Sequence, residues 1–194
     1  FNRQLLDIGD KYADEVARRF PEVQRRVGGY NIDALVRSPN GTNNLAHLLV
    51  GSEGTLAYSE RIQLHLSNIP SHKVLGVCHF PTFYAAMDSA QHIVKLGPSA
   101  VELVDRTMIE LARDIPIFRD VIGQIVVGQP DALLLVEFSG DDLDAQLKGL
   151  EQLQELMNDL GFLGSVTEAI NPGFQKEIWE VRKSGLNIMM SMKG

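Results

Sequence analysis

Two glycines three residues apart mark the stretch whose residue types best suit contact with a ligand, Gly51-Ser52-Glu53-Gly54-Thr55-Leu56. Glycine accepts positive φ angles and lets a flat molecule come within van der Waals distance of the main chain. A loop of this kind suits a cofactor that is held through backbone N–H groups. Two glycines also form ordinary turns, so the spacing alone leaves both interpretations open.

A second stretch, residues 171–185, has the pattern of an amphipathic helix and carries an arginine. Three apolar residues share one helical face, while Trp179 and Arg182 are three positions apart and can be neighbours on another face. From the spacing alone, Arg182 is either solvated or paired with a nearby carboxylate, Glu177 or Glu180. The sequence therefore leaves the role of this arginine open.

Composition narrows the class of protein. The chain has 194 residues, of which 44% are hydrophobic, and no run approaches the roughly 20 apolar residues that cross a bilayer. A net charge of −7 without a basic cluster argues against a nucleic-acid partner. The single cysteine, Cys78, suits a reducing compartment such as the cytoplasm. The five histidines lack the spacing of paired zinc ligands, so no metal site is expected.

The elements that must position these stretches follow from hydrophobic periodicity. Ile62, Leu64 and Leu66 alternate with polar residues, which predicts a half-buried strand that ends before a domain boundary near Pro70. Beyond it, a strand, a helix and a strand occur twice. The predicted ranges are 74–80, 81–96 and 99–104, then 132–138, 141–160 and 163–170. This pattern indicates an α+β fold, the ferredoxin-like antiparallel sheet with both helices on one face.

Three blocks together resemble the FAD-linked oxidases, the vanillyl-alcohol oxidase superfamily. They are residues 25–35, in which two arginines precede Gly29-Tyr30-Asn31, the loop at residues 51–56, and Trp179-x-x-Arg182. The resemblance implies that residues 1–70 are the C-terminal part of a PCMH-type FAD-binding domain. Residues 71–194 would then form the ferredoxin-like C-terminal cap domain, which contributes to the substrate site and is truncated in this chain.

The resemblance also implies an activity. The intact protein would be an FAD-linked dehydrogenase or oxidase that oxidises a 2-hydroxy acid, such as lactate, glycolate or 2-hydroxyglutarate, by hydride transfer to flavin. Arg182 matches the arginine that holds the substrate carboxylate, a role that suits the two parallel donors of a guanidinium. Gly51, Ser52, Gly54 and Thr55 would position the flavin. Catalytic residues and metal ligands would lie outside these residues, so we expect the isolated chain to be inactive.

Substrate and partners are less defined. Several 2-hydroxyglutarate-type members have a hydroxyl residue one turn after the arginine, where this sequence has Leu186. The residues that follow are similar to large members with an iron–sulfur region downstream. The electron acceptor is therefore a quinone, an electron-transfer flavoprotein or such an iron–sulfur region, and a homodimer and a peripheral membrane contact through the acceptor stay open. The alternative is a non-catalytic ferredoxin-like binding or assembly module, because such sheets serve many functions.

Overall fold

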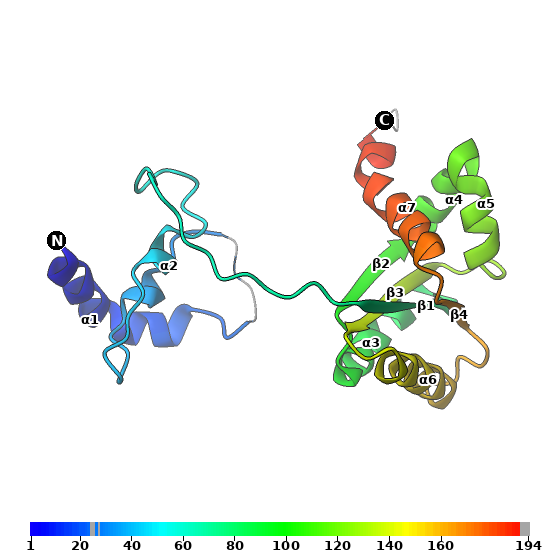
Figure 1. The fold of residues 1–194 in the computed structure, drawn as a ribbon, viewed down its shortest axis with the longest axis horizontal. Coiled ribbons are helices and arrows are strands. Elements are labelled where there is room, and N and C mark those ends of the chain that lie inside the picture. The colour runs from blue at the N-terminus through cyan, green and yellow to red at the C-terminus, as the bar shows by residue number, and fades with distance from the viewer. Residues whose placement is uncertain (24–25, 27, 191–194) are drawn as a thin grey trace. The chain divides into compact units, whose positions relative to one another are not determined.

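The computed structural model describes residues 1–23, 26 and 28–190, which form two compact units, Phe1–Leu66 and Ser67–Gly194. Figure 1 shows the helices of the first unit in blue and cyan and the sheet of the second unit in green to orange. No helix among the described residues is long and apolar enough to cross a membrane.

The first unit is built around the contact of one helix with a short 3-10 helix. Its elements are α1 (Asn2–Arg19), the 3-10 helix η1 (Ile32–Leu35) and α2 (Ala46–Leu49). A Cβ placed on Gly9 of α1 would lie 2.0 Å from the carbonyl oxygen of Leu35, so only glycine permits this approach. The side chain of Leu35 is buried beneath the contact.

Residues 57–71 contain no strand, so the prediction of a half-buried strand in this segment is wrong. The side chains of Ile62, Leu64 and Leu66 are 69%, 74% and 93% exposed. A strand requires a neighbouring strand to satisfy its backbone N–H and C=O groups, and the described part of the first unit has no strand. The period-two pattern is thus present in the sequence without a sheet to pair with.

The second unit is organised around a four-stranded antiparallel sheet. Its strands are β1 (His72–Phe80), β2 (Ala100–Asp105), β3 (Ala132–Gly140) and β4 (Val166–Ala169). The spatial order is β2-β3-β1-β4, so the two central strands are the first strands of the two repeats. This order and the antiparallel pairing confirm the predicted α+β, ferredoxin-like class.

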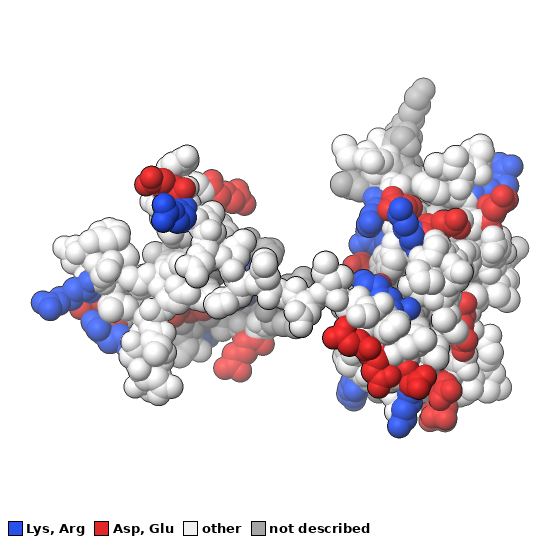
Figure 2. All heavy atoms as spheres, viewed as in Figure 1, with Lys and Arg blue, Asp and Glu red and all other residues white. Residues whose placement is uncertain are grey.

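One face of this sheet is covered by the two helices of the repeats, as the sequence predicts. These helices are α3 (Phe83–Ile93), which continues into the 3-10 helix η2 (Val94–Leu96), and α6 (Leu143–Asp159). Thr82 and Asp142 cap α3 and α6 by accepting hydrogen bonds from backbone N–H groups. The apolar side of α6 packs on the sheet, and Figure 2 shows acidic side chains gathered on the surface where α6 lies.

The opposite face is covered as well, which the sequence analysis did not anticipate. Figure 1 shows α4 (Arg106–Asp114), α5 (Pro116–Ile125) and α7 (Pro172–Met190) on this side. Their apolar side chains form a second core with the sheet, which includes Ile109, Ile122 and Ile178. The ferredoxin-like sheet is therefore enclosed between two helical layers, because the connection between the repeats is helical and α7 returns over it.

His79 is a buried histidine of β1 with a structural role. Its Nδ1 lies 2.8 Å from the carbonyl oxygen of Ser165, and its Nε2 accepts a hydrogen bond from the backbone N–H of Val127 at 3.1 Å. The ring thereby connects β1 to the segment before β4 and to the segment after α5. Both ring nitrogens of this buried histidine therefore have hydrogen-bond partners.

Burial makes the single cysteine unreactive. Cys78 is fully buried in β1, and desolvation of its thiolate raises the pKa of the thiol to about 12. At pH 8 the reactive thiolate is therefore scarce as well as inaccessible. We expect Cys78 in the native protein to resist labelling by 5,5′-dithiobis(2-nitrobenzoate) at pH 8, and to react stoichiometrically after denaturation in guanidinium chloride. Rapid labelling of the native protein would contradict this prediction.

Candidate functional site

The glycine loop of the first unit has the backbone geometry that the sequence suggests. Gly51, Glu53 and Gly54 have φ angles of 80°, 51° and 77°, all in the left-handed region. A Cβ added to either glycine would have no neighbour within 4 Å, so both face open space. The main chain at these glycines is accessible to a flat ligand, which fits the backbone contact expected for a flavin ring.

The loop is held in place by the two residues of the upstream Gly-Tyr-Asn block. The hydroxyl of Tyr30 lies 2.8 Å from the hydroxyl oxygen of Thr55. The side-chain amide of Asn31 donates to the carbonyl oxygens of His47 and Val50, at 3.2 and 3.0 Å. The Gly-Tyr-Asn block and the glycine loop, which are separate in the sequence, are therefore joined by hydrogen bonds in the structure.

The four candidate flavin-positioning residues divide into two kinds. Gly51 and Gly54 are exposed, whereas the side chain of Ser52 is buried. The hydroxyl of Thr55 donates to the carbonyl oxygen of Ser52 at 2.6 Å, and the backbone N–H of Thr55 donates to the same oxygen. Ser52 and Thr55 therefore support the shape of the loop, although Thr55 is exposed like the glycines. The open backbone lies at Gly51 and Gly54.

In the second unit, polar residues of α7 contact the sheet at successive turns of the helix. Gln175 is the first: its side-chain amide lies 2.9, 2.8 and 3.0 Å from the carbonyl oxygens of Lys73, Ala169 and Ile170. The start of α7 is therefore fixed to β1 and to the end of β4.

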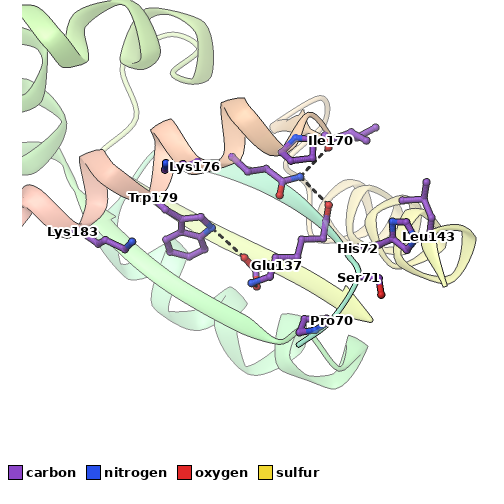
Figure 3. Close-up of a pocket in the computed structure, with 12 residues that line it drawn as sticks. Pro70, Ser71, His72, Glu137, Leu143, Ile170, Lys176, Trp179 and Lys183 are labelled. Carbon is purple, nitrogen blue, oxygen red and sulfur yellow. Dashed lines mark hydrogen bonds and ion pairs between the residues drawn. The ribbon is translucent and has the colours of Figure 1, made fainter. Parts of the chain in front are cut away.

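Trp179 and a buried carboxylate form the second contact. The indole Nε1 donates to Oε2 of Glu137 on β3 at 3.1 Å, as Figure 3 shows. The other carboxylate oxygen of Glu137 accepts hydrogen bonds from Lys73 Nζ at 3.1 Å and from the Ser99 hydroxyl at 3.3 Å. Glu137 is only 7% exposed, so these three donors compensate the desolvation of its charge.

Arg182 makes the third contact, and its partner is neither Glu177 nor Glu180. Its Nε and Nη2 donate to the same oxygen, Oε2 of Glu102 on β2, at 3.1 and 2.6 Å. Glu180 pairs instead with Lys183, its neighbour along α7. Both groups of the Arg182–Glu102 pair are about 40% exposed, so the guanidinium is accessible from solvent.

An open pocket of about 650 Å³ lies at this polar side of α7, within the size range of small-molecule sites. Trp179 and Lys183 of α7 line this pocket, whereas Arg182, which lies between them in the sequence, does not. Its remaining polar lining comes mainly from residues of β1, β3 and α7, among them Lys73, Glu137, Gln175 and Lys176. Sequence reasoning missed this pocket because Lys73 and Glu137 are 64 residues apart and belong to no motif.

Among the described residues, no group of three or more His, Cys, Asp or Glu side chains is arranged to hold a metal ion. The side chain of Leu186 lies outside what the structure describes.

Comparison with known proteins assigns the family. Residues 69–194 match the model of the family described as FAD linked oxidases, C-terminal domain. The chain belongs to this family. The match begins near the start of the second unit and includes the sheet, α7 and Arg182. The resemblance suggested by the sequence is thereby confirmed.

Relatives within the family are dehydrogenases. The chain is 27% identical to a D-2-hydroxyglutarate dehydrogenase from Pantoea ananatis, over 99% of this chain and 20% of that protein. It is 34% identical to a mitochondrial D-lactate dehydrogenase (cytochrome) from Arabidopsis thaliana, over 74% of this chain and 24% of that protein. A solved structure of alkyldihydroxyacetonephosphate synthase matches 75% of this chain and 28% of its own length, with a TM-score of 0.48 and 15% identity.

These shares show that the chain spans about a fifth to a quarter of the length of the two curated relatives. The family membership rests on the match over residues 69–194.

The buried carboxylate predicts a measurable contribution of the α7 contact to stability. Glu137→Ala should lower the free energy of unfolding by about 1 to 3 kcal/mol, because the indole N–H of Trp179 loses its acceptor and the ammonium group of Lys73 loses its partner. Glu180→Ala is the matched control, since it removes an exposed ion pair on the same helix and should cost less than about 1 kcal/mol. Urea unfolding followed by circular dichroism measures both, and equal effects would contradict the prediction.

Proposed function

We propose that this chain is part of an FAD-dependent dehydrogenase that oxidises a 2-hydroxy acid, with Arg182 binding the substrate carboxylate. The proposal is supported by membership of the FAD-linked oxidase family and by relatives named D-2-hydroxyglutarate and D-lactate dehydrogenase. The observation that carries it is the solvent-accessible guanidinium of Arg182 on α7. Two other residues of this helix, Trp179 and Lys183, line a pocket that Arg182 itself does not line.

A guanidinium suits this role because it is charged at every working pH and presents paired N–H donors to a planar carboxylate. In the proposed complex, Arg182 orients the hydroxy acid through its carboxylate, and the indole of Trp179 forms an apolar wall of the pocket. When bound, FAD would supply the acceptor for the hydride from the hydroxyl-bearing carbon. The residues of this chain therefore bind and orient, and the base that removes the hydroxyl proton belongs to the rest of the protein.

For the first unit, we propose that residues 1–70 contribute to the FAD-binding domain through the glycine loop. The support is the accessible backbone at Gly51 and Gly54 and the rigid connection of the loop to Tyr30 and Asn31. Ser52 and Thr55 act in this proposal by fixing the shape of the loop. The ring would approach the main chain at the two glycines, where a larger residue is strained by the positive φ angle.

The substrate is proposed to be D-2-hydroxyglutarate or D-lactate, because these acids appear in the names of the relatives. Electrons from the reduced flavin would pass to a quinone, an electron-transfer flavoprotein or an iron–sulfur region of the same protein. The direct test is to purify the intact protein, record its visible spectrum, and measure reduction of an artificial electron acceptor with a panel of 2-hydroxy acids. A colourless, folded protein would instead favour a non-catalytic module.

The proposed role of Arg182 predicts a selective loss of substrate affinity. In the intact flavoprotein, Arg182→Ala should raise KM for the hydroxy acid about 10- to 100-fold, because a charge-assisted pair of hydrogen bonds is lost. Bound flavin should be unchanged, and Arg182→Lys should recover part of the affinity. Arg106→Ala is the matched control, since Arg106 forms an exposed ion pair with Asp131. An unchanged kcat/KM in Arg182→Ala would remove this residue from the proposed role.

The proposed role of the glycine loop predicts a selective loss of flavin. Gly54→Ala in the intact protein should lower flavin occupancy, because a side chain strains a backbone with φ of 77° and stands where the ring would approach. Gly41→Ala is the control, because Gly41 also has a positive φ angle, 66°, and open space around it. The ratio of absorbance at 450 and 280 nm measures occupancy, and equal loss in both variants would indicate a general effect of backbone strain.

A further inference from the structure

We propose that Glu102 is a positioning residue for substrate binding, which holds the guanidinium of Arg182 so that its remaining donors face the incoming carboxylate. This inference rests on the proposed function. The inference adds to the proposed function a role for Glu102, a residue of β2 that lies 80 positions before Arg182 in the sequence. No motif or spacing in the sequence indicates a role for Glu102, and only the folded chain brings it to α7.

The geometry of the ion pair leaves part of the guanidinium available. A guanidinium has five N–H donors in a planar fork, one on Nε and two on each terminal nitrogen. Oε2 of Glu102 accepts from Nε and from Nη2, which together form one edge of the plane. The other edge, made by both terminal nitrogens, retains two parallel N–H donors and so can bind a carboxylate in the bidentate manner. Glu102 and a substrate would therefore use different edges of the same group.

The two partners are carried by regular elements. Glu102 lies within β2, where its backbone is paired in register with Leu135 of β3. Arg182 lies within α7, which is anchored one turn earlier by Trp179. A free arginine side chain samples many rotamers and loses this freedom when it is held in one orientation. A partner on a fixed strand reduces this freedom before the substrate arrives, so less is lost on binding.

The exposure of the pair separates positioning from a structural role. Arg182 and Glu102 are 41% and 39% exposed, and ion pairs this open contribute little to folding stability. Removing Glu102 should thus leave the fold and the flavin intact. The same exposure makes the opposite role conceivable, in which Glu102 competes with the substrate for Arg182. The two roles predict opposite signs, since loss of a positioning residue raises KM and loss of a competitor lowers it.

The experiment compares Glu102→Ala and Glu102→Gln in the intact flavoprotein, using the hydroxy acid that the wild-type protein oxidises. Glu102→Ala should raise KM about tenfold while kcat changes less than about twofold, because the guanidinium remains present but is no longer oriented. Glu102→Gln keeps an acceptor oxygen at the same position and should raise KM only about threefold. In the double variant with Arg182→Ala, loss of Glu102 should add nothing, since its effect passes through the arginine.

Asp131→Ala is the matched control, because Asp131 pairs with Arg106 in an ion pair of similar exposure at the end of β2. It should leave KM unchanged. Thermal unfolding and flavin content should be the same in all of these proteins. If Glu102→Ala loses flavin or fails to fold, Glu102→Gln decides the question.

The outcomes distinguish the two levels of the proposal. If the wild-type protein oxidises a 2-hydroxy acid but Glu102→Ala has an unchanged or lowered KM, the positioning role is wrong and the proposed function stands. If the wild-type protein contains no flavin, or oxidises no 2-hydroxy acid, the proposed function and this inference both fail.

Discussion

The second unit depends on the way α7 satisfies polar groups on the face of the sheet that it covers. Three of its side chains, Gln175, Trp179 and Arg182, recur at spacings of four and three and each reach a polar group of the sheet or its ends. The same helix buries Ile178 and Val181 in the core with α4 and α5. Its orientation is therefore fixed by apolar packing on one side and by hydrogen bonds on the other.

These polar contacts set the character of the candidate site. Glu137 is buried and fully paired, so it acts as a rigid anchor, whereas Glu102 and Arg182 are accessible and can meet a ligand. Burial of a carboxylate is costly unless it is hydrogen-bonded, and both oxygens of Glu137 have donors, Trp179 for one and Lys73 and Ser99 for the other. Along α7, the exposed Arg182–Glu102 ion pair therefore follows one turn after the contact of Trp179 with the buried Glu137.

The class of the fold could be predicted because its signals are local. The apolar runs at β1 and β3 and the periodic stripe of α6 each lie within one continuous segment, and two repeats restrict the topology. The second helical layer could not be predicted, since nothing local tells α7 which face of the sheet to cover. The prediction of a strand within residues 57–71 was wrong for the reverse reason. The alternating pattern is local, but a strand forms only where a second strand is available to pair with it.

The candidate site was predictable only in part. The glycine loop and Arg182 stand out by residue type and spacing, and the structure adds that Tyr30 and Asn31 hold the loop. The partner of Arg182 was missed because residue spacing can suggest ion pairs only between neighbours on the same helix, such as Glu177 and Glu180. Glu102 becomes a neighbour through the pairing of β2 with β3, a relation of high sequence separation.

The side chain of Gln175 lies where the pairing of β4 with β1 ends. The pairing of β4 with β1 covers residues 75–78 of β1, and the carbonyl of Lys73 lies beyond it. The side-chain amide of Gln175 donates to that carbonyl, where a further residue of β4 would otherwise donate. An edge that leaves such groups vacant recruits strands from other chains. Here a glutamine imitates the missing strand, so a foreign strand must first displace it before extending the sheet at this corner.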